Sequence, residues 1–152
     1  MSKNVLIVMC GLPASGKSTY SQWLAENAHF YRVCPDLIRK DLYGDENIQG
    51  DGKKVFSIAH YQMKELGSVG GNVVFDATNI DRNRRIELVK KMRPYFDIII
   101  CKWFHTPFVI CLERNQKRER QVPEDVLWRM SDNFQAPAMD EGFDIVEEIK
   151  NY

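Results

Sequence analysis

The sequence lacks the features that would assign it to several special classes of protein. Its 152 residues include only 9 glycines and 6 prolines and show no internal repeat, which excludes collagen-like, low-complexity and disordered chains. The longest apolar run near the start, Val5 to Cys10, is too short for a signal-peptide core or a membrane span. We therefore expect one globular domain over residues 1–152, cytoplasmic and without a membrane partner.

Metal-binding and redox spacings are also missing. The four cysteines show no C-x-x-C pair, so no zinc or redox motif is indicated, and we expect reduced, buried thiols. The three histidines are scattered without ligand spacing. These residues are Cys10, Cys34, Cys101, Cys111, His29, His60 and His105.

Net charge is absent too, because 21 basic residues balance 21 acidic ones. Bulk electrostatics therefore give no argument for a nucleic-acid partner. The charges are unevenly spread, however: residues 82–93 hold six bases and one acid, and residues 131–149 hold six acids and no base. A neutral protein can still present one basic face, although solvated helix faces are the simpler interpretation.

Apolar runs and helical periodicity alternate along the chain. The runs predict strands at residues 4–10, 30–34, 72–76, 97–104 and 144–149. Periodic segments predict helices at 17–28, 36–43, about 55–66, 81–92, from Thr106-Pro107 onward, and through 126–134. Thr106 is the expected N-cap of its helix, followed by a proline at the first helical position. Trp23 and Trp128 fall on the apolar sides of their helices and are expected in the core. This alternation is typical of an α/β domain with a parallel sheet.

A phosphate-binding loop lies between the first strand and the first helix. Its residues match G-x-x-x-x-G-K-[ST] at every position. In such loops the backbone amides and the positive end of the helix cradle phosphates, Lys17 reaches the β- and γ-phosphates, and the hydroxyl of Ser18 ligates Mg²⁺. We therefore expect ATP and Mg²⁺ as cofactors. The nucleotide-binding residues would be Gly11, Leu12, Pro13, Ala14, Ser15, Gly16, Lys17, Ser18 and Thr19.

The class of P-loop protein follows partly from what accompanies this motif. A guanine-nucleotide switch would carry an Asn-Lys-x-Asp motif, and the chain has none. Motor or AAA-type ATPases are typically longer and take an arginine from a neighbouring subunit. Short chains with this loop are more often phosphotransferases that act on a small acceptor or on a chain end.

Candidate acceptor residues follow the second and third strands. Asp36 lies where the carboxyl end of a parallel strand opens to the ligand crevice, and Arg39 lies on the same helical face. A carboxylate there can orient an acceptor hydroxyl and remove its proton late in phosphoryl transfer, but it can also serve only as a helix cap. Asp76 ends the third strand and is a candidate to bind Mg²⁺, or its waters, or the acceptor. Thr78 and Asn79 could bind substrate, and Asn79 could simply cap the next helix.

The polar segment 113–120 lies between two helices, where a kinase would have a lid. An arginine there can stabilise charge on the transferring phosphoryl group. Arg118 is the stronger candidate, and Arg120 is expected at the surface.

Four motifs together resemble a known family. They are Gly-x-x-x-x-Gly-Lys-Ser-Thr at 11–19, Asp36-x-x-Arg39, Asp76-Ala-Thr-Asn79, and Arg114-Asn-x-Lys-Arg118 followed by Val122-Pro123. They resemble the kinase module of phage-type polynucleotide 5′-kinases, within a wider group of small P-loop kinases that includes zeta-toxin-like proteins. The resemblance extends over residues 5–134. It implies a three-layer P-loop sandwich with a five-stranded parallel sheet in the order 2-3-1-4-5, helices on both faces and a small helical lid at about 114–122.

The resemblance also implies roles for individual residues. Lys17 and Ser18 would hold the triphosphate and Mg²⁺, and Asp36 would be the general base at the 5′-hydroxyl. Arg39 would bind the adjacent phosphate of the acceptor strand, and Arg118 would be the catalytic lid arginine. Arg114 would lie near the donor nucleotide, and the acceptor side would be lined by Asp76, Thr78 and Asn79.

Three functions remain open from the sequence. The first is ATP-dependent phosphorylation of a 5′-hydroxyl end of DNA or RNA, without the phosphatase activity that an Asp-x-Asp-x-Thr motif would bring; it predicts a steep salt dependence of binding. The second is a small-molecule kinase acting on a nucleoside, nucleotide or sugar, which the neutral charge and the acidic start of the 45–52 loop favour. The third is a non-catalytic nucleotide-binding module. The oligomeric state is not indicated.

Overall fold

Strands and helices alternate along residues 2–152, the part of the chain that the computed structural model describes. The strands are β1 (Val5–Cys10), β2 (Phe30–Val33), β3 (Asn72–Phe75), β4 (Ile98–Phe104) and β5 (Ile145–Ile149). The helices are α1 (Lys17–Asn27), α2 (Pro35–Tyr43), α3 (Gly52–Ser68), α4 (Arg82–Met92), α5 (Phe108–Gln116) and α6 (Glu124–Asp132), with short 3-10 helices η1 (Arg93–Tyr95) and η2 (Met139–Glu141). Every predicted strand is present and begins and ends within one residue of its expected bounds.

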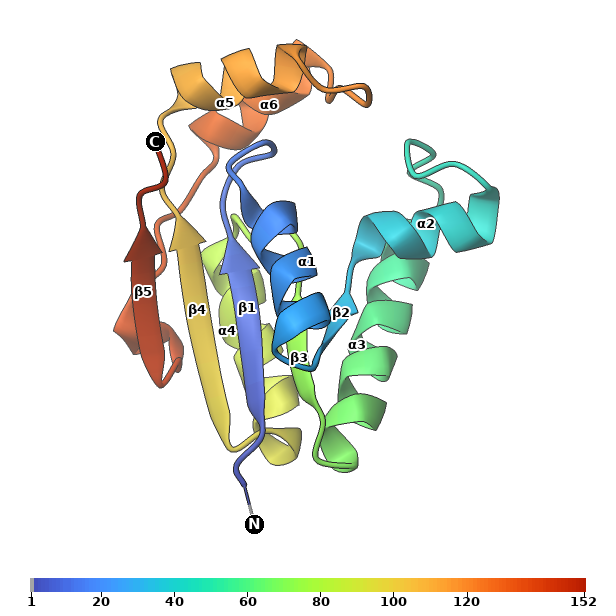
Figure 1. Cartoon of the computed structure of the whole chain (residues 1–152), viewed down its shortest axis with the longest axis vertical. Coiled ribbons are helices and arrows are strands. Elements are labelled where there is room, and N and C mark those ends of the chain that lie inside the picture. Colours follow the sequence, from blue (N-terminus) through green and yellow to red (C-terminus); the bar gives the residue numbers. More distant parts are fainter. Residues whose placement is uncertain (1) are drawn as a thin grey trace.

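The five strands form one parallel sheet in the order β2-β3-β1-β4-β5 (Figure 1). This order confirms the one that the resemblance implies. The central strand β1 pairs with β3 on one side and β4 on the other, for example through Leu6 with Val73 and with Ile99. Because β1 is covered on both faces, its apolar run is continuous, as expected of a buried parallel strand.

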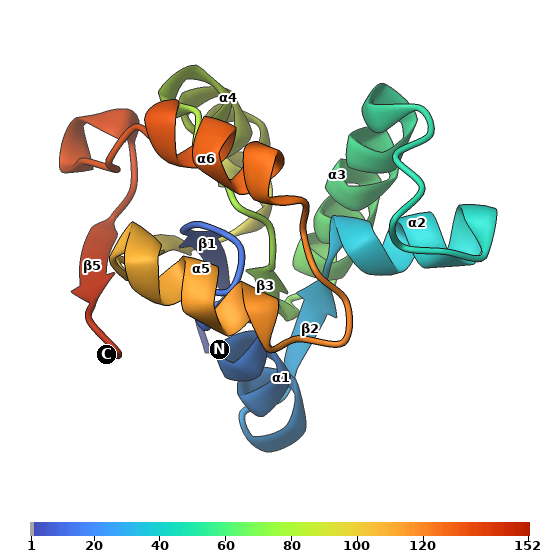
Figure 2. The same cartoon turned by 90° about the horizontal axis from the view of Figure 1, so that it is seen from above.

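Helices cover both faces of the sheet, as Figure 2 shows from above. Successive side chains of a strand point to opposite faces, so Leu6 and Val8 pack in the core beneath α3 and α4. Ile7 and Met9 pack in the smaller core beneath α1, against Leu24. The result is the three-layer sandwich that the sequence predicts.

The carboxyl ends of the parallel strands meet at one edge of the sheet. The P-loop follows β1, α2 follows β2, and the segment beginning at Asp76 follows β3 at this edge. Helices α5 and α6 cross above it, as Figure 1 shows at the top of the molecule. This edge therefore gathers the motifs that the sequence singles out.

The two uneven charge runs pair with each other. Arg85 of α4 is fully buried and meets Glu141, also fully buried, with Nε to Oε1 at 2.6 Å. Arg82 reaches the same carboxylate at 3.2 Å, and Arg93 binds Asp144 at 2.7 Å. The basic helix and the acidic C-terminal segment thus hold each other in place, and much of the suspected basic face serves the fold.

Two local predictions are wrong. The hydroxyl of Thr106 does not cap α5; it donates to the carbonyl of Ser15 in the P-loop at 3.1 Å. Trp23 and Trp128 are not core residues, because they are 55% and 49% exposed.

The cysteine prediction agrees with the described residues. All four cysteines are free and buried, as expected. Within residues 2–152, no helix combines the length and apolar character that a bilayer span requires. The same residues contain no cluster of His, Cys, Asp and Glu side chains suited to hold a metal by themselves.

Candidate active site

The P-loop has the backbone conformation that its sequence requires. Gly16 has a φ of 104°, in the left-handed region that favours glycine, and Ala14 adopts a φ of 65°. A Cβ on Gly16 would also collide with the side-chain amide of Asn151, which donates to the carbonyl of Ser15 at 3.0 Å. Thus the turn needs a glycine at this position, and a larger residue would also displace the side chain of Asn151.

Lys17 lies buried inside the loop. Its Nζ donates to the carbonyl oxygens of Gly11 at 2.9 Å and Leu12 at 2.6 Å, and to Oγ of Ser15 at 3.3 Å. Burial lowers the pKa of Lys17 to about 8, while the carboxylate of Asp76 acts in the opposite direction. A bound triphosphate would offer this ammonium group a stronger partner than neutral carbonyls.

Ser18 and Thr19 lie in the first turn of α1 and are exposed. Ser21, one turn further along, donates from Oγ to Oδ2 of Asp76 at 2.8 Å and to the carbonyl of Ser18 at 3.1 Å. Ser21 thus connects the first turn of α1 to the carboxylate of Asp76.

Asp76 is buried and held by a residue that the sequence analysis missed. Arg32 of β2 donates from Nε at 3.0 Å and from Nη2 at 2.7 Å, both to Oδ2 of Asp76. No described residue donates a hydrogen bond to the other oxygen, Oδ1. Asp76 therefore offers a single free oxygen at the sheet edge.

Thr78 and Asn79 support the P-loop from below. The carbonyl of Thr78 accepts from the backbone N–H of Gly11 at 3.0 Å. The side-chain amide of Asn79 donates to the carbonyl of Met9 at 2.6 Å, and its backbone has a φ of 47°. Asn79 does not cap α4, because Asp81 does so through its side chain. Both residues therefore bind the backbone of β1 and the P-loop, and their role in binding an acceptor stays a prediction.

Asp36 and Arg39 form a pair at the start of α2. Oδ1 of Asp36 accepts from Nη1 of Arg39 at 3.0 Å, and the carboxylate side chain is 40% exposed. Arg39 is mostly buried, and its Nε has no hydrogen-bond partner among the described residues. A carboxylate open to solvent beside a guanidinium offers an acceptor for a hydroxyl group and a cation for a neighbouring anionic oxygen.

Arg120, expected at the surface, contacts the acceptor side. Its Nη1 reaches Oδ2 of Asp36 at 3.3 Å, and its Nε donates to Oδ1 of Asn47 at 2.8 Å. The lid therefore contacts both Asp36 and the loop at residues 45–52, which we call the acceptor loop, through Arg120. Sequence spacing gave no signal for this contact, because it joins residues 84 positions apart.

The two predicted lid arginines lie toward the nucleotide side. Arg114 donates from Nη2 to the carbonyl of Asn151 at 2.9 Å, next to the end of the P-loop. The positive charge of Arg118 makes a small contribution, after burial, to the lowered pKa of Lys17, which means that Arg118 lies near the loop. Their predicted roles at the donor triphosphate remain predictions.

A model of a protein family described as an AAA domain matches residues 6–137. The chain belongs to this family. The matched range includes the P-loop, Asp36, Arg39, Asp76 and the lid arginines.

Two curated proteins are similar to the chain. L-seryl-tRNA(Sec) kinase of Methanococcus maripaludis is 26% identical over 152 residues, which covers 93% of this chain and 56% of that protein. Transcription factor bHLH140 of Arabidopsis thaliana is 24% identical over 151 residues, which covers 93% of this chain and 15% of that protein. The chain therefore spans only part of the length of these relatives.

Solved structures share the fold at low sequence identity. One, of the Pnkp1/Rnl/Hen1 RNA repair complex, has a TM-score of 0.77 at 21% identity, over 88% of this chain and 44% of that one. A gluconokinase from Sinorhizobium meliloti has a TM-score of 0.67 at 18% identity, over 99% and 84%. The Mycobacterium tuberculosis APS kinase CysC, solved with AMPPNP and APS, has a TM-score of 0.68 at 18% identity, over 100% and 92%.

These comparisons confirm the resemblance to small P-loop kinases. The kinases named differ in their acceptors, so the acceptor has to be argued from this chain's own site.

Proposed function

We propose that this protein transfers the γ-phosphate of ATP to the 5′-hydroxyl end of DNA or RNA, in a reaction that requires Mg²⁺. The proposal depends on one observation, the pair formed by Asp36 and Arg39 at the start of α2, on the side of the sheet where the carboxyl ends of the strands meet. Its open carboxylate and the guanidinium beside it fit an acceptor that presents a hydroxyl and, close by, a phosphate.

Each residue then has a chemical role. Asp36 orients the acceptor hydroxyl and takes its proton late in the transfer, for which an ordinary carboxylate suffices because the transition state is loose. Arg39 binds the phosphate on the 3′ side of the first nucleoside. Lys17 and Arg118 stabilise the negative charge on the transferring phosphoryl group.

The residues present fit Mg²⁺ as a cofactor. Mg²⁺ is usually bound through one or two carboxylates together with substrate phosphates and waters, and not by an all-protein cage. Ser18 offers an exposed hydroxyl, and Asp76 offers Oδ1, which accepts no hydrogen bond from the described residues. Bound there, the cation would neutralise charge on the phosphates.

A small-molecule kinase is the second candidate. Glu46 belongs to the loop at residues 45–52, and its Oε1 lies 3.5 Å from Nε of Arg120. Its negative charge would repel a long polyanion. The formal net charge of zero also favours a small acceptor.

Transfer from γ-labelled ATP to a panel of acceptors tests the proposal. The panel contains 5′-hydroxyl DNA and RNA oligonucleotides, nucleoside 3′-monophosphates, nucleosides and sugars. We expect label on the oligonucleotides, a loss of label of at least about 100-fold in Asp36→Asn, and a comparable loss in Lys17→Ala. Asp41→Asn is the matched control, since Asp41 is an exposed acid on the same helix without an ion pair among the described residues.

Each other outcome contradicts a part of the proposal. Label on small acceptors alone would establish a small-molecule kinase. ATP binding without any transfer would favour the non-catalytic module. Equal transfer by Asp36→Asn and the wild type would remove Asp36 from the mechanism.

A further inference from the structure

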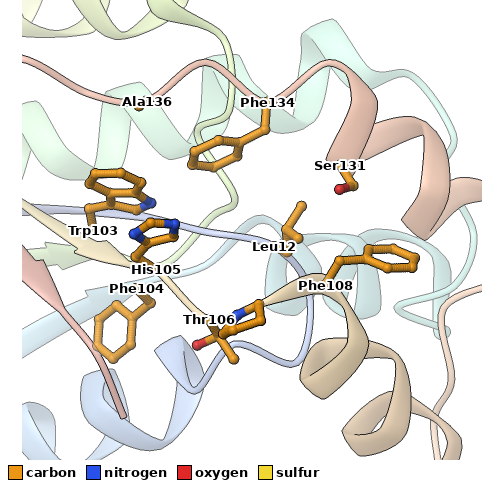
Figure 3. Close-up of a pocket in the computed structure, with 10 residues that line it drawn as sticks. Leu12, Trp103, Phe104, His105, Thr106, Phe108, Ser131, Phe134 and Ala136 are labelled. Atoms are coloured by element: carbon orange, nitrogen blue, oxygen red, sulfur yellow. The ribbon is translucent and has the colours of Figure 1, made fainter. Parts of the chain in front are cut away.

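A cavity of about 350 Å³ lies beside the P-loop, next to Leu12 and beneath α5 and α6. Figure 3 shows Trp103 and His105 on one side of it and Phe108 and Ser131 on the other. None of its lining residues is an acid, a lysine or an arginine. The cavity therefore does not fit a phosphate, although it adjoins the loop that binds them.

The rings around the cavity form a stack. Trp103 and His105 are 4.3 Å apart between ring centroids with planes 16° apart, and Trp103 and Phe134 are 6.1 Å and 24° apart. Nδ1 of His105 is engaged by Glu148 at 2.7 Å, which leaves Nε2 of the same ring without a partner among the described residues. Near-parallel rings with a polar edge are suited to a flat heteroaromatic ligand.

A polar groove of about 920 Å³ begins where the aromatic cavity ends, because Phe134 lines both. Arg84 and Arg129 line this groove, are exposed, and have no ion-pair partner among the described residues. The acids Asp81 and Asp132 line it as well, but a side-chain oxygen of Asp81 is engaged by the backbone N–H of Arg84.

These two arginines differ from most bases of the 82–93 run. Four of the six basic residues in that run are in ion pairs, namely Arg82, Arg85, Lys91 and Arg93. Arg84 is free for an external anion and lies in the groove, whereas Lys90 is exposed but does not line it. A neutral aromatic cavity that continues into a groove with free arginines has the two parts that bind a nucleotide chain: a ring stack for a base and cations for the phosphates.

We propose that this cavity and groove bind a single-stranded segment of the acceptor, with one base stacked on the exposed ring of His105, at the end of the stack that continues through Trp103 to Phe134, and the neighbouring phosphates at Arg84 and Arg129. The inference rests on the proposed function, since it names where the acceptor strand lies beyond its 5′ end. Stacking accepts every base, so the site would bind strands with little sequence preference.

The phosphate half of the site is tested by the salt dependence of binding. A 5′-hydroxyl oligonucleotide with a 3′ fluorophore is titrated with protein at 50 and 200 mM salt, with anisotropy as the readout. Each phosphate contact to a single strand contributes about 0.7 to the slope of log affinity against log salt. Arg84→Gln/Arg129→Gln should therefore flatten the slope by about 1.4. The ratio of wild-type affinity to variant affinity should then be about sevenfold smaller at 200 mM salt than at 50 mM salt.

Lys90→Gln is the matched control, because it removes a free base from the same helix outside the groove. Its slope should equal that of the wild type. An unchanged slope in the double variant, or an equal change in Lys90→Gln, would overturn the assignment of phosphates to this groove.

The base half is tested by the fluorescence of Trp103. The chain has three tryptophans, so Trp23→Phe/Trp128→Phe leaves Trp103 as the single reporter. We expect oligonucleotides to quench it and inorganic phosphate to have no effect. His105→Ala, a change at an exposed ring, should weaken oligonucleotide binding at least about fivefold, the lower end for losing one stacked base.

The outcomes separate this inference from the proposed function. Phosphorylation of oligonucleotides without quenching of Trp103 would overturn the inference and leave the kinase assignment intact. If a nucleoside 3′-monophosphate quenched Trp103 as strongly as an oligonucleotide and bound with equal affinity, the ligand of this site would be a free nucleotide and not a strand. Phosphorylation of a sugar, with no binding of oligonucleotides, would contradict both.

Discussion

The burial of the Lys17 ammonium group should make ATP binding depend on pH between 7 and 9. Burial lowers the pKa of Lys17 from 10.5 to about 8. A lysine with a pKa of 8 is charged in about 90% of molecules at pH 7 and in about 10% at pH 9. Because the triphosphate binds the charged form, ATP affinity should fall about tenfold from pH 7 to pH 9, and binding at pH 8 should take up about half a proton. With a pKa of 10.5 the affinity would hardly change over this range.

Calorimetry of Mg-ATP binding at pH 7, 8 and 9, repeated in two buffers of different ionisation enthalpy, measures both quantities. Lys17→Arg is the control, because a guanidinium stays charged across this range and should abolish the pH dependence even if it weakens binding. It leaves Cys10 and Cys111 in place, so it also separates Lys17 from the thiols that influence it. Equal wild-type affinity at pH 7 and 9 would refute the argument, as would the same slope in Lys17→Arg.

Two further contacts give measurable effects. Arg120→Ala should open Asp36 to water and so raise the rate of ATP hydrolysis in the absence of acceptor. The increase should be at most about fivefold, which corresponds to the loss of an ion pair of about 1 kcal/mol. Phosphate release measures this rate, and a decrease would mean that Arg120 assists transfer instead. Glu141→Gln should lower the free energy of unfolding, measured in urea, by about 3–5 kcal/mol, because it leaves the charge of Arg85 buried with a weaker partner. The double variant Arg85→Met/Glu141→Leu removes both charges and should lower this free energy much less. Equal losses of stability in the two variants would show that packing, and not the unpaired charge, determines the effect.

The sheet could be predicted from the sequence because its signals are local. The continuous apolar run of β1 and the motif at Gly11–Ser18 fix a strand, a loop and a helix within a short segment. Parallel strands bring their carboxyl ends together, so Asp36 and Asp76 could be expected at one edge. The strand order came from the resemblance alone, since spacing does not distinguish it from other doubly wound orders.

The contacts that complete the site could not be predicted, because they join distant parts of the chain. Arg32 lies in a short edge strand, and nothing in its neighbourhood indicates that it would bind Asp76, 44 positions away. Arg120 was assigned to the surface because a polar segment between helices is usually solvated, yet the lid brings it to Asp36. The capping role expected for Asn79 was wrong since Asp81 is the better-placed acceptor at the helix start.

Ion pairing also changes what salt can reveal about the acceptor. From the charge runs, a polynucleotide kinase was expected to bind with a steep salt dependence. In the fold, however, half of the six bases in the run neutralise the acidic C-terminal segment, which leaves Arg84 and Arg129 in the groove, together with Arg39 beside Asp36, as the arginines that we assign to the strand. Three such contacts give a slope of only about −2 for a single strand. A shallow slope would therefore agree with an oligonucleotide acceptor here, and its loss in the arginine variants is more informative than its size.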